Sequence, residues 1–156
     1  MLFRSGAHPA NYIRALTDAD IHLLAKERAG ILLLTVAPNK VMPDQISALT
    51  RAGIHVSLGH SNATDLEAKA AIDAGARAVT HLFNAMSQCE ARAPGLVGAT
   101  LADPRVICGL IADGHHVAPT AILAALAAKG PHGIALISDA MPSAAGGPDQ
   151  FTLQGQ

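Results

Sequence analysis

Aromatic and charged side chains are scarce in this sequence. Among its 156 residues there is no tryptophan, one tyrosine and three phenylalanines, and charged residues make up 15%. The formal net charge at pH 7 is −1, which argues against a nucleic-acid-binding protein, because contact with phosphates requires a basic surface. Hydrophobic residues still make up 50% of the chain, so we expect a folded protein with an aliphatic core.

Long hydrophobic runs and cysteine motifs are also absent. The longest apolar stretches, residues 31–34 and 106–112, are far shorter than the roughly 20 residues that span a bilayer, so no membrane partner is expected. The first five residues lack the apolar region of a signal peptide. Cys89 and Cys108 form no recognisable spacing, which favours a reducing, cytoplasmic location.

What the sequence does have is a regular alternation of predicted strands and helices. The predicted strands span residues 31–36, 54–60, 78–83, 106–112 and 133–138. The predicted helices span residues 17–29, 43–52, 64–74 and 119–129, with a short helix expected near 97–101. Capping residues or proline begin most of these helices, and glycine ends them. This alternation predicts an α/β fold with about five parallel strands.

The number of strands limits the possible architectures. A complete (β/α)8 barrel requires roughly 200 residues or more, so 156 residues correspond to a portion of a TIM-like barrel or to an open sheet. We treat residues 1–156 as a single segment of such a fold. The final residues, 151–156, look like the start of a further strand rather than an end of the fold.

Histidine is frequent, at eight residues, and a polar side chain lies at the carboxyl end of every predicted strand: Thr35, His60, His81, Asp113 and Asp139. Neighbouring parallel strands lie about 4.8 Å apart, so His60 and His81 could share a zinc ion or simply form a hydrogen-bonded pair. Asp139 could exchange protons with a metal-activated water, or could cap the segment after its strand. Thr35 and Asp113 could equally have structural roles.

Five short motifs carry a more specific signal: GHSNAT at 59–64, HLFNAM at 81–86, RAPGL at 92–96, DGHH at 113–116 and SDA at 138–140. Together with GAHP at 6–9, their order and spacing resemble the N-acetylglucosamine-6-phosphate deacetylases of the amidohydrolase superfamily. The resemblance covers nearly the whole chain. It implies a (β/α)8 barrel beside a small β-sandwich domain, and hydrolysis of the N-acetyl group of N-acetylglucosamine 6-phosphate to glucosamine 6-phosphate and acetate.

The resemblance also implies roles for individual residues. His60 and His81 match ligands of a divalent cation, zinc or iron, and Asp139 matches the catalytic acid/base. His8 matches a histidine that helps to polarise the substrate carbonyl. The implied substrate contacts are Ala7, His8, Asn84, Ala85, Arg92, Asp113 and His116. Arg92 would bind the phosphate, and in the homodimers of the family it can serve the neighbouring subunit's site.

The chain departs from the family pattern in several respects. Family members carry a glutamate metal ligand upstream of the stretch that matches residues 6–8, and no glutamate of this chain replaces it by motif. The β-sandwich and the last barrel strands are also expected to be missing. Three hypotheses therefore remain: a segment of a working deacetylase, an inactive fragment with residual phosphosugar or metal binding, and an amidohydrolase that acts on another amide.

Overall fold

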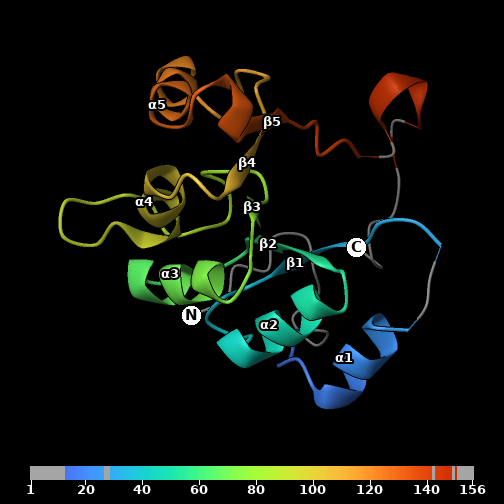
Figure 1. The fold of residues 1–156 in the computed structure, drawn as a ribbon. Helices are drawn as coiled ribbons and strands as arrows, with labels where there is room; N and C mark the ends of the chain where they lie inside the picture. The colour runs from blue at the N-terminus through green and yellow to red at the C-terminus, as the bar shows by residue number, and fades with distance from the viewer. Residues whose placement is uncertain (1–12, 27–28, 142, 149, 151–156) are drawn as a thin grey trace.

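The computed structural model describes residues 13–26, 29–141, 143–148 and 150. Five strands form one parallel sheet in the order β1-β2-β3-β4-β5 (Figure 1). The strands are β1 (Leu33–Val36), β2 (His55–Leu58), β3 (Ala78–Val79), β4 (Ile107–Leu110) and β5 (Ile134–Leu136). The helices are α1 (Asp18–Leu24), α2 (Pro43–Arg51), α3 (Asp65–Asp73), α4 (Gly95–Ala102) and α5 (Pro119–Lys129), with 3₁₀ turns at Pro131–Gly133 and Ala144–Gly146.

The strand order matches that of a (β/α) barrel. Each strand pairs in parallel with the next one in the sequence, whereas a doubly wound sheet reverses its order midway. Right-handed crossovers in an unreversed order place all the connecting helices on one face of the sheet. Figure 1 shows α3, α4 and α5 stacked in this way beside the strands. The predicted α/β class with five parallel strands is confirmed.

Local side-chain chemistry explains where the helices begin. The Thr64 hydroxyl accepts a hydrogen bond from the Glu67 backbone N–H at 3.2 Å, and the Glu67 carboxylate accepts one from the Thr64 N–H at 2.8 Å. Thr17 and Asp20 form the same reciprocal cap on α1. These bonds satisfy N–H groups that the first helical turn leaves without partners, so the predicted starts of both helices are confirmed.

Some predicted lengths were wrong. The first helix was expected to reach residue 29, but α1 ends at Leu24. The third strand was expected to span 78–83, but β3 has only two residues because His81 and Phe83 adopt left-handed backbone conformations with φ of 37° and 77°. Extended strands cannot accommodate positive φ, so the chain leaves the sheet there.

The two faces of the sheet differ in chemistry. Strand side chains on the helix-covered face are aliphatic and buried, as at Val56, Leu58 and Leu110, which are at most 1% exposed. On the opposite face, the Thr80 hydroxyl lies 2.8 Å from that of Thr35 and 2.6 Å from that of Ser57. The core therefore lies between the sheet and its helices, and the other face carries a small hydroxyl cluster.

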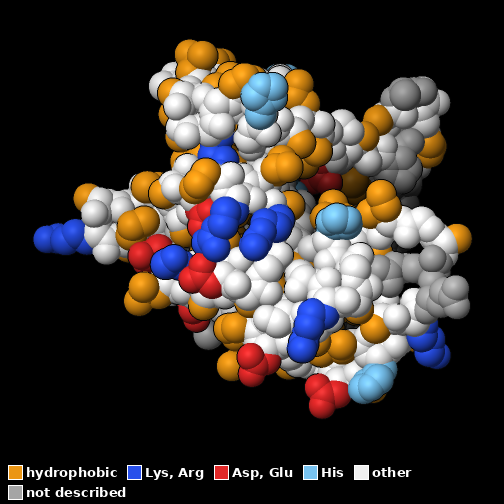
Figure 2. Space-filling model, viewed as in Figure 1, with side chains coloured by type: hydrophobic (Ala, Val, Ile, Leu, Met, Phe, Trp, Pro, Cys, Tyr) orange, Lys and Arg blue, Asp and Glu red, His pale blue; other side chains and the backbone are white. Residues whose placement is uncertain are grey.

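The surface carries no single dominant charge in the view of Figure 2, where basic and acidic side chains lie side by side near α3 and α4. One basic side chain pairs with two acidic ones, since the Arg105 guanidinium lies 2.8 Å from Asp73 and 2.6 Å from Asp103. Within the described residues, no helix is both long enough and apolar enough to cross a membrane.

Candidate active site at the carboxyl ends of the strands

Two histidines meet at the carboxyl ends of β2 and β3. His60 and His81 follow these neighbouring strands, and their Nε2 atoms lie 2.9 Å apart. The ring centroids are 4.8 Å apart and the ring planes are inclined at 70°. His81 is almost fully buried, at 5% exposed, whereas His60 is partly exposed. The structure therefore brings together the two residues that the strand pattern placed at one edge.

Strained backbone accompanies this pair. Five described non-glycine residues have positive φ, and all of them follow strands: His60 (47°), His81 (37°), Phe83 (77°), Ala85 (50°) and Asp139 (50°). Left-handed backbone costs an L-residue roughly 1–2 kcal/mol, and such strain concentrates at functional sites. Four of the five are residues that the sequence marked as site candidates. No pattern in the sequence indicated their backbone conformation.

Backbone hydrogen bonds join the two histidine loops. The Ser61 N–H donates to the Ala85 carbonyl at 3.1 Å, and the Ser87 N–H donates to the Ser61 carbonyl at 2.9 Å. The Asn84 N–H donates to the His81 carbonyl at 2.9 Å. The predicted substrate residues Asn84 and Ala85 thus lie in the same loop structure as the histidines, because these bonds tie the segment after β3 to the segment after β2.

Ser61 was not singled out from the sequence, yet it supports the loop that carries His60. Its side chain is fully buried, donates to the Asn39 side-chain carbonyl at 2.8 Å and accepts from the Ala63 N–H at 3.0 Å. Ser87 has a similar role in the loop after β3, since its hydroxyl donates to the Ala63 carbonyl and accepts from the Leu96 N–H. In the sequence, the only sign of this role was that Ser61 directly follows the candidate ligand His60.

The histidine pair suits a divalent cation, although it does not complete a site. A tetrahedral zinc ion that binds both nitrogens at about 2.0–2.1 Å would hold them roughly 3.3 Å apart, close to the observed separation. His81 Nδ1 is buried and has no hydrogen-bond partner among the described residues. Catalytic zinc sites use three protein ligands, and no group of three potential ligands occurs within the residues that the structure describes. The described residues therefore bring together two histidine nitrogens without a third potential ligand.

Asp113 and His116 form a second polar unit, in the loop after β4. One carboxylate oxygen of Asp113 accepts hydrogen bonds from the backbone N–H groups of His115 and His116, each at 2.9 Å. The other oxygen lies 2.6 Å from Nδ1 of His116. These hydrogen bonds hold the pKa of Asp113 well below its usual range. The carboxylate is thus ionised at neutral pH and can only accept.

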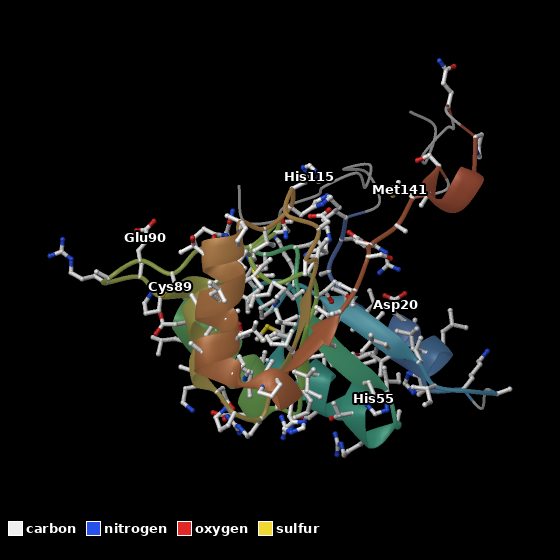
Figure 3. The ribbon with its side chains drawn as sticks, turned by 90° about the horizontal axis from the view of Figure 1, so that it is seen from above. Asp20, His55, Cys89, Glu90, His115 and Met141 are labelled. Atoms are coloured by element: carbon white, nitrogen blue, oxygen red, sulfur yellow. The ribbon has the colours of Figure 1, made fainter. Side chains whose placement is uncertain are left out.

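Two further predicted site residues, Arg92 and Asp139, lie on exposed segments. Arg92 is exposed and lies in a small turn closed by backbone bonds between Glu90 and Ala93, on a loop that extends away from the sheet (Figure 3). Asp139 follows β5 and is exposed, and it forms no three-residue cluster with the histidines. The predicted residues Ala7 and His8 lie outside the described residues.

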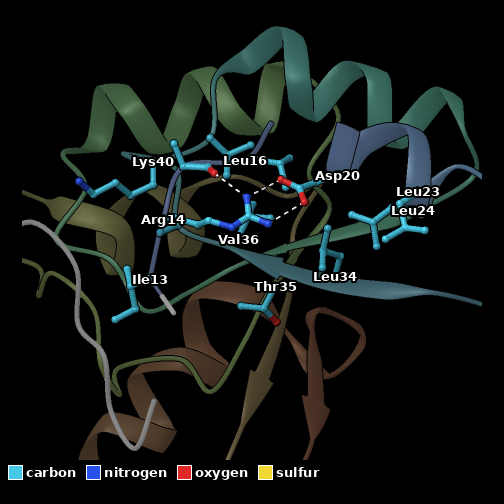
Figure 4. A pocket seen from close by; sticks show the side chains of 13 residues that line it. Ile13, Arg14, Leu16, Asp20, Leu23, Leu24, Leu34, Thr35, Val36 and Lys40 are labelled. Atoms are coloured by element: carbon cyan, nitrogen blue, oxygen red, sulfur yellow. Dashed lines mark hydrogen bonds and ion pairs between the residues drawn. The ribbon is translucent and has the colours of Figure 1, made fainter. Parts of the chain in front are cut away.

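A pocket away from the histidine pair is lined by none of the predicted site residues. Its volume is about 440 Å³, and it lies between α1, β1 and the segment before α1 (Figure 4). Its lining is mostly aliphatic, and its main polar feature is the ion pair between Arg14 and Asp20, with oxygens at 2.5 and 2.7 Å from the guanidinium. Asp20 also forms the capping box of α1 with Thr17, so this pair has a structural role there.

Comparison with known proteins points to one group of enzymes, although no family model matches the chain. The chain is 42% identical over 151 residues to N-acetylgalactosamine-6-phosphate deacetylase of Shewanella sp. (strain ANA-3), covering 97% of this chain and 38% of the relative. It is also 42% identical over 151 residues to N-acetylglucosamine-6-phosphate deacetylase of Vibrio furnissii, covering 95% and 37%.

Solved structures agree. The chain superposes on N-acetylglucosamine-6-phosphate deacetylase from Pasteurella multocida with a TM-score of 0.91 and 37% identity, over 97% of this chain and 40% of that one. It therefore spans about two fifths of the length of the relatives it matches. Within that span, the sequence identity and the shared fold make this chain a homologue of the N-acetylglucosamine- and N-acetylgalactosamine-6-phosphate deacetylases.

Proposed function

We propose that this chain carries two metal-binding residues and the acid/base residue of a deacetylase that acts on an N-acetylhexosamine 6-phosphate, such as N-acetylglucosamine 6-phosphate. The observation that carries the proposal is the convergence of His60 and His81, with Nε2 atoms 2.9 Å apart, in a homologue of enzymes named for this reaction. The two relatives differ in the sugar that they are named for and are equally identical to this chain, so both sugars are candidate substrates.

In this proposal His60 and His81 hold a divalent cation, zinc or iron, through their Nε2 atoms. When bound, such a cation polarises the amide carbonyl and lowers the pKa of water. Asp139 takes a proton from the attacking water and later delivers it to the departing amine nitrogen. The water oxygen forms a bond to the carbonyl carbon, the C–N bond breaks, and the products are acetate and the amino sugar phosphate.

The other predicted residues would position the substrate. Arg92 would bind the phosphate through its bidentate guanidinium, and its exposed position on a protruding turn is compatible with a neighbouring subunit of a homodimer. Ala7, His8, Asn84, Ala85, Asp113 and His116 complete the proposed substrate contacts. We place the reaction in the cytoplasm, where phosphorylated sugars are retained.

The cation assignment is tested by measuring bound metal after dialysis of the 156-residue chain against zinc. We expect saturable zinc binding that His60→Ala and His81→Ala each weaken by at least about 100-fold. His22→Ala is the matched control, because His22 lies on α1 with Nδ1 bonded to the Asp18 carbonyl. Equal zinc binding in all four proteins would contradict the assignment.

The reaction itself is tested by acetate release from the two N-acetylhexosamine 6-phosphates. Turnover that requires His60, His81 and Asp139 would support the proposal. Zinc binding without any acetate release would instead identify this chain as a binding segment that lacks catalysis. Release of acetate from unphosphorylated N-acetyl sugars at the same kcat/KM would indicate a different amide substrate and would remove the phosphate assignment of Arg92.

A further inference from the structure

The loop after β4 contains a histidine whose orientation is fixed by its own chain. Asp113 and His116 are three residues apart, and the carboxylate binds both the backbone and the ring of the histidine. His115 lies between them but contributes only its backbone N–H to Asp113. The His116 side chain is more than half exposed, so the carboxylate fixes the ring while solvent can still reach it.

We propose that Asp113 is a positioning residue that fixes His116 in the tautomer with a proton on Nδ1, which leaves Nε2 without a proton as an acceptor for the substrate. An ionised carboxylate can only accept, so the 2.6 Å contact requires Nδ1 to be the donor. Neutral imidazole carries a single N–H, which leaves Nε2 as a hydrogen-bond acceptor. The role in substrate binding rests on the proposed function, whereas the tautomer does not.

The arrangement of the two carboxylate oxygens makes the proposal straightforward to test. Oδ1 is occupied by two backbone donors and Oδ2 by the ring. In Asp113→Asn, the amide oxygen must accept the hydrogen bonds from the two backbone N–H groups, since an NH₂ group cannot accept hydrogen bonds from them. The amide nitrogen then replaces Oδ2 and donates to Nδ1, so the ring proton must move to Nε2. The substitution should therefore invert the tautomer without removing the turn.

The experiment is long-range ¹H–¹⁵N correlation of the imidazole rings in the uniformly ¹⁵N-labelled chain, at a pH where the histidines are neutral. His116 is identified from the signal that disappears in His116→Gln. His22 is an internal reference, because its Nδ1 lies 2.8 Å from a backbone carbonyl, which can only accept. We expect His116 to show the same Nδ1–H pattern as His22 in the wild type.

In Asp113→Asn we expect the His116 pattern to invert while that of His22 stays unchanged. A wild-type His116 that shows the Nε2–H form, or an even mixture of both forms, would overturn the proposal. An unchanged pattern in a folded Asp113→Asn variant would overturn it as well. If the variant does not fold, the wild-type pattern alone decides, and Asp113→Ser then tests whether loss of the ring contact yields a mixture.

Kinetics separate this inference from the proposed function. If the chain releases acetate, Asp113→Asn should raise KM about 10-fold or more with a smaller change in kcat, because Nε2 then presents a donor where the substrate met an acceptor. Equal KM values with an inverted tautomer would mean that Asp113 sets the tautomer but that Nε2 does not meet substrate. Absence of acetate release in the wild type would contradict the proposed function. The tautomer of His116 would still be decided by the NMR measurement.

Discussion

The two ends of the sheet use left-handed backbone in different ways. At the amino ends, the described residues of the turns that lead into β1, β2, β3 and β5 have positive φ only at glycine, as at Gly53 and Gly75. At the carboxyl ends, positive φ also occurs at residues with side chains, including His60, His81 and Asp139. Glycine adopts this conformation without steric cost, whereas other residues are strained. The difference indicates that the amino ends serve stability and the carboxyl ends serve function.

The largest expected effect comes from removing the acid/base group at the carboxyl end. In a catalytically complete chain, Asp139→Asn should lower kcat by about 10²–10⁴-fold, because an amide cannot take the proton from water. Bound metal should stay unchanged. Acetate release and metal content, measured on the same samples, check this prediction. Near-normal turnover would show that Asp139 has a structural role and not a catalytic one.

A substitution at the amino end should instead affect stability. Gly75 has φ of 119°, and a Cβ there would lie 2.8 Å from the Thr50 hydroxyl. Gly75→Ala should therefore lower the free energy of unfolding by about 2 kcal/mol or more. Gly53→Ala is the control, since φ is 75° but nothing lies within 4 Å of the added Cβ. Urea denaturation should show the smaller loss for Gly53→Ala; equal losses would mean that contact with Thr50 adds nothing.

The reverse substitution at the carboxyl end should be nearly neutral or stabilising. Ala85 has φ of 50°, so Ala85→Gly removes roughly 1–2 kcal/mol of backbone strain and adds roughly 0.5–1 kcal/mol of chain entropy in the unfolded state. We expect the free energy of unfolding to rise by about 0.5 kcal/mol. Ala70→Gly in the exposed middle of α3 should lower it by about 1 kcal/mol. A clear loss at Ala85 would show that its backbone is not strained.

The smallest expected effect concerns charge at the amino end. The Arg105 guanidinium beside Asp103 lowers the pKa of that carboxyl to about 2. The unfolded chain binds a proton at Asp103 near pH 4, so the folded state gains stability above that pH and loses it as pH falls toward 2. The gain should be below about 1 kcal/mol, because the pair is near the surface. Urea denaturation at about pH 5 and about pH 3 checks it, with Asp103→Asn as the variant.

In that variant the fall in stability between the two pH values should be smaller than in the wild type. Added salt should reduce the difference further, since it screens surface charges. A fall of equal size in both proteins would remove Asp103 as the cause. The Asp113 carboxylate also titrates below its usual range, so both proteins retain its contribution as a common background.

Many features of the fold could be predicted because they depend on neighbours in the sequence. The capping pair Thr64 and Glu67 spans three residues, and Pro119 and Gly130 bound α5 where the pattern placed its ends. The alternation of strands and helices sufficed to predict a parallel sheet, and the positions of His60 and His81 after successive strands sufficed to predict that they meet. The motifs at the strand ends were enough to indicate the family.

Other features depend on contacts between distant residues, which no local pattern encodes. The support of Ser61 by Asn39 joins residues 22 apart, and the hydroxyl contact of Thr35 with Thr80 joins residues 45 apart. The early end of β3 follows from left-handed backbone at His81, which hydrogen bonds between loops maintain. The sequence by itself therefore determined the elements, their order and the chemical groups at the sheet edge. Only the tertiary structure decided the backbone strain and the loop contacts, because each requires the free energy of many packed contacts to hold a conformation that the local chain disfavours.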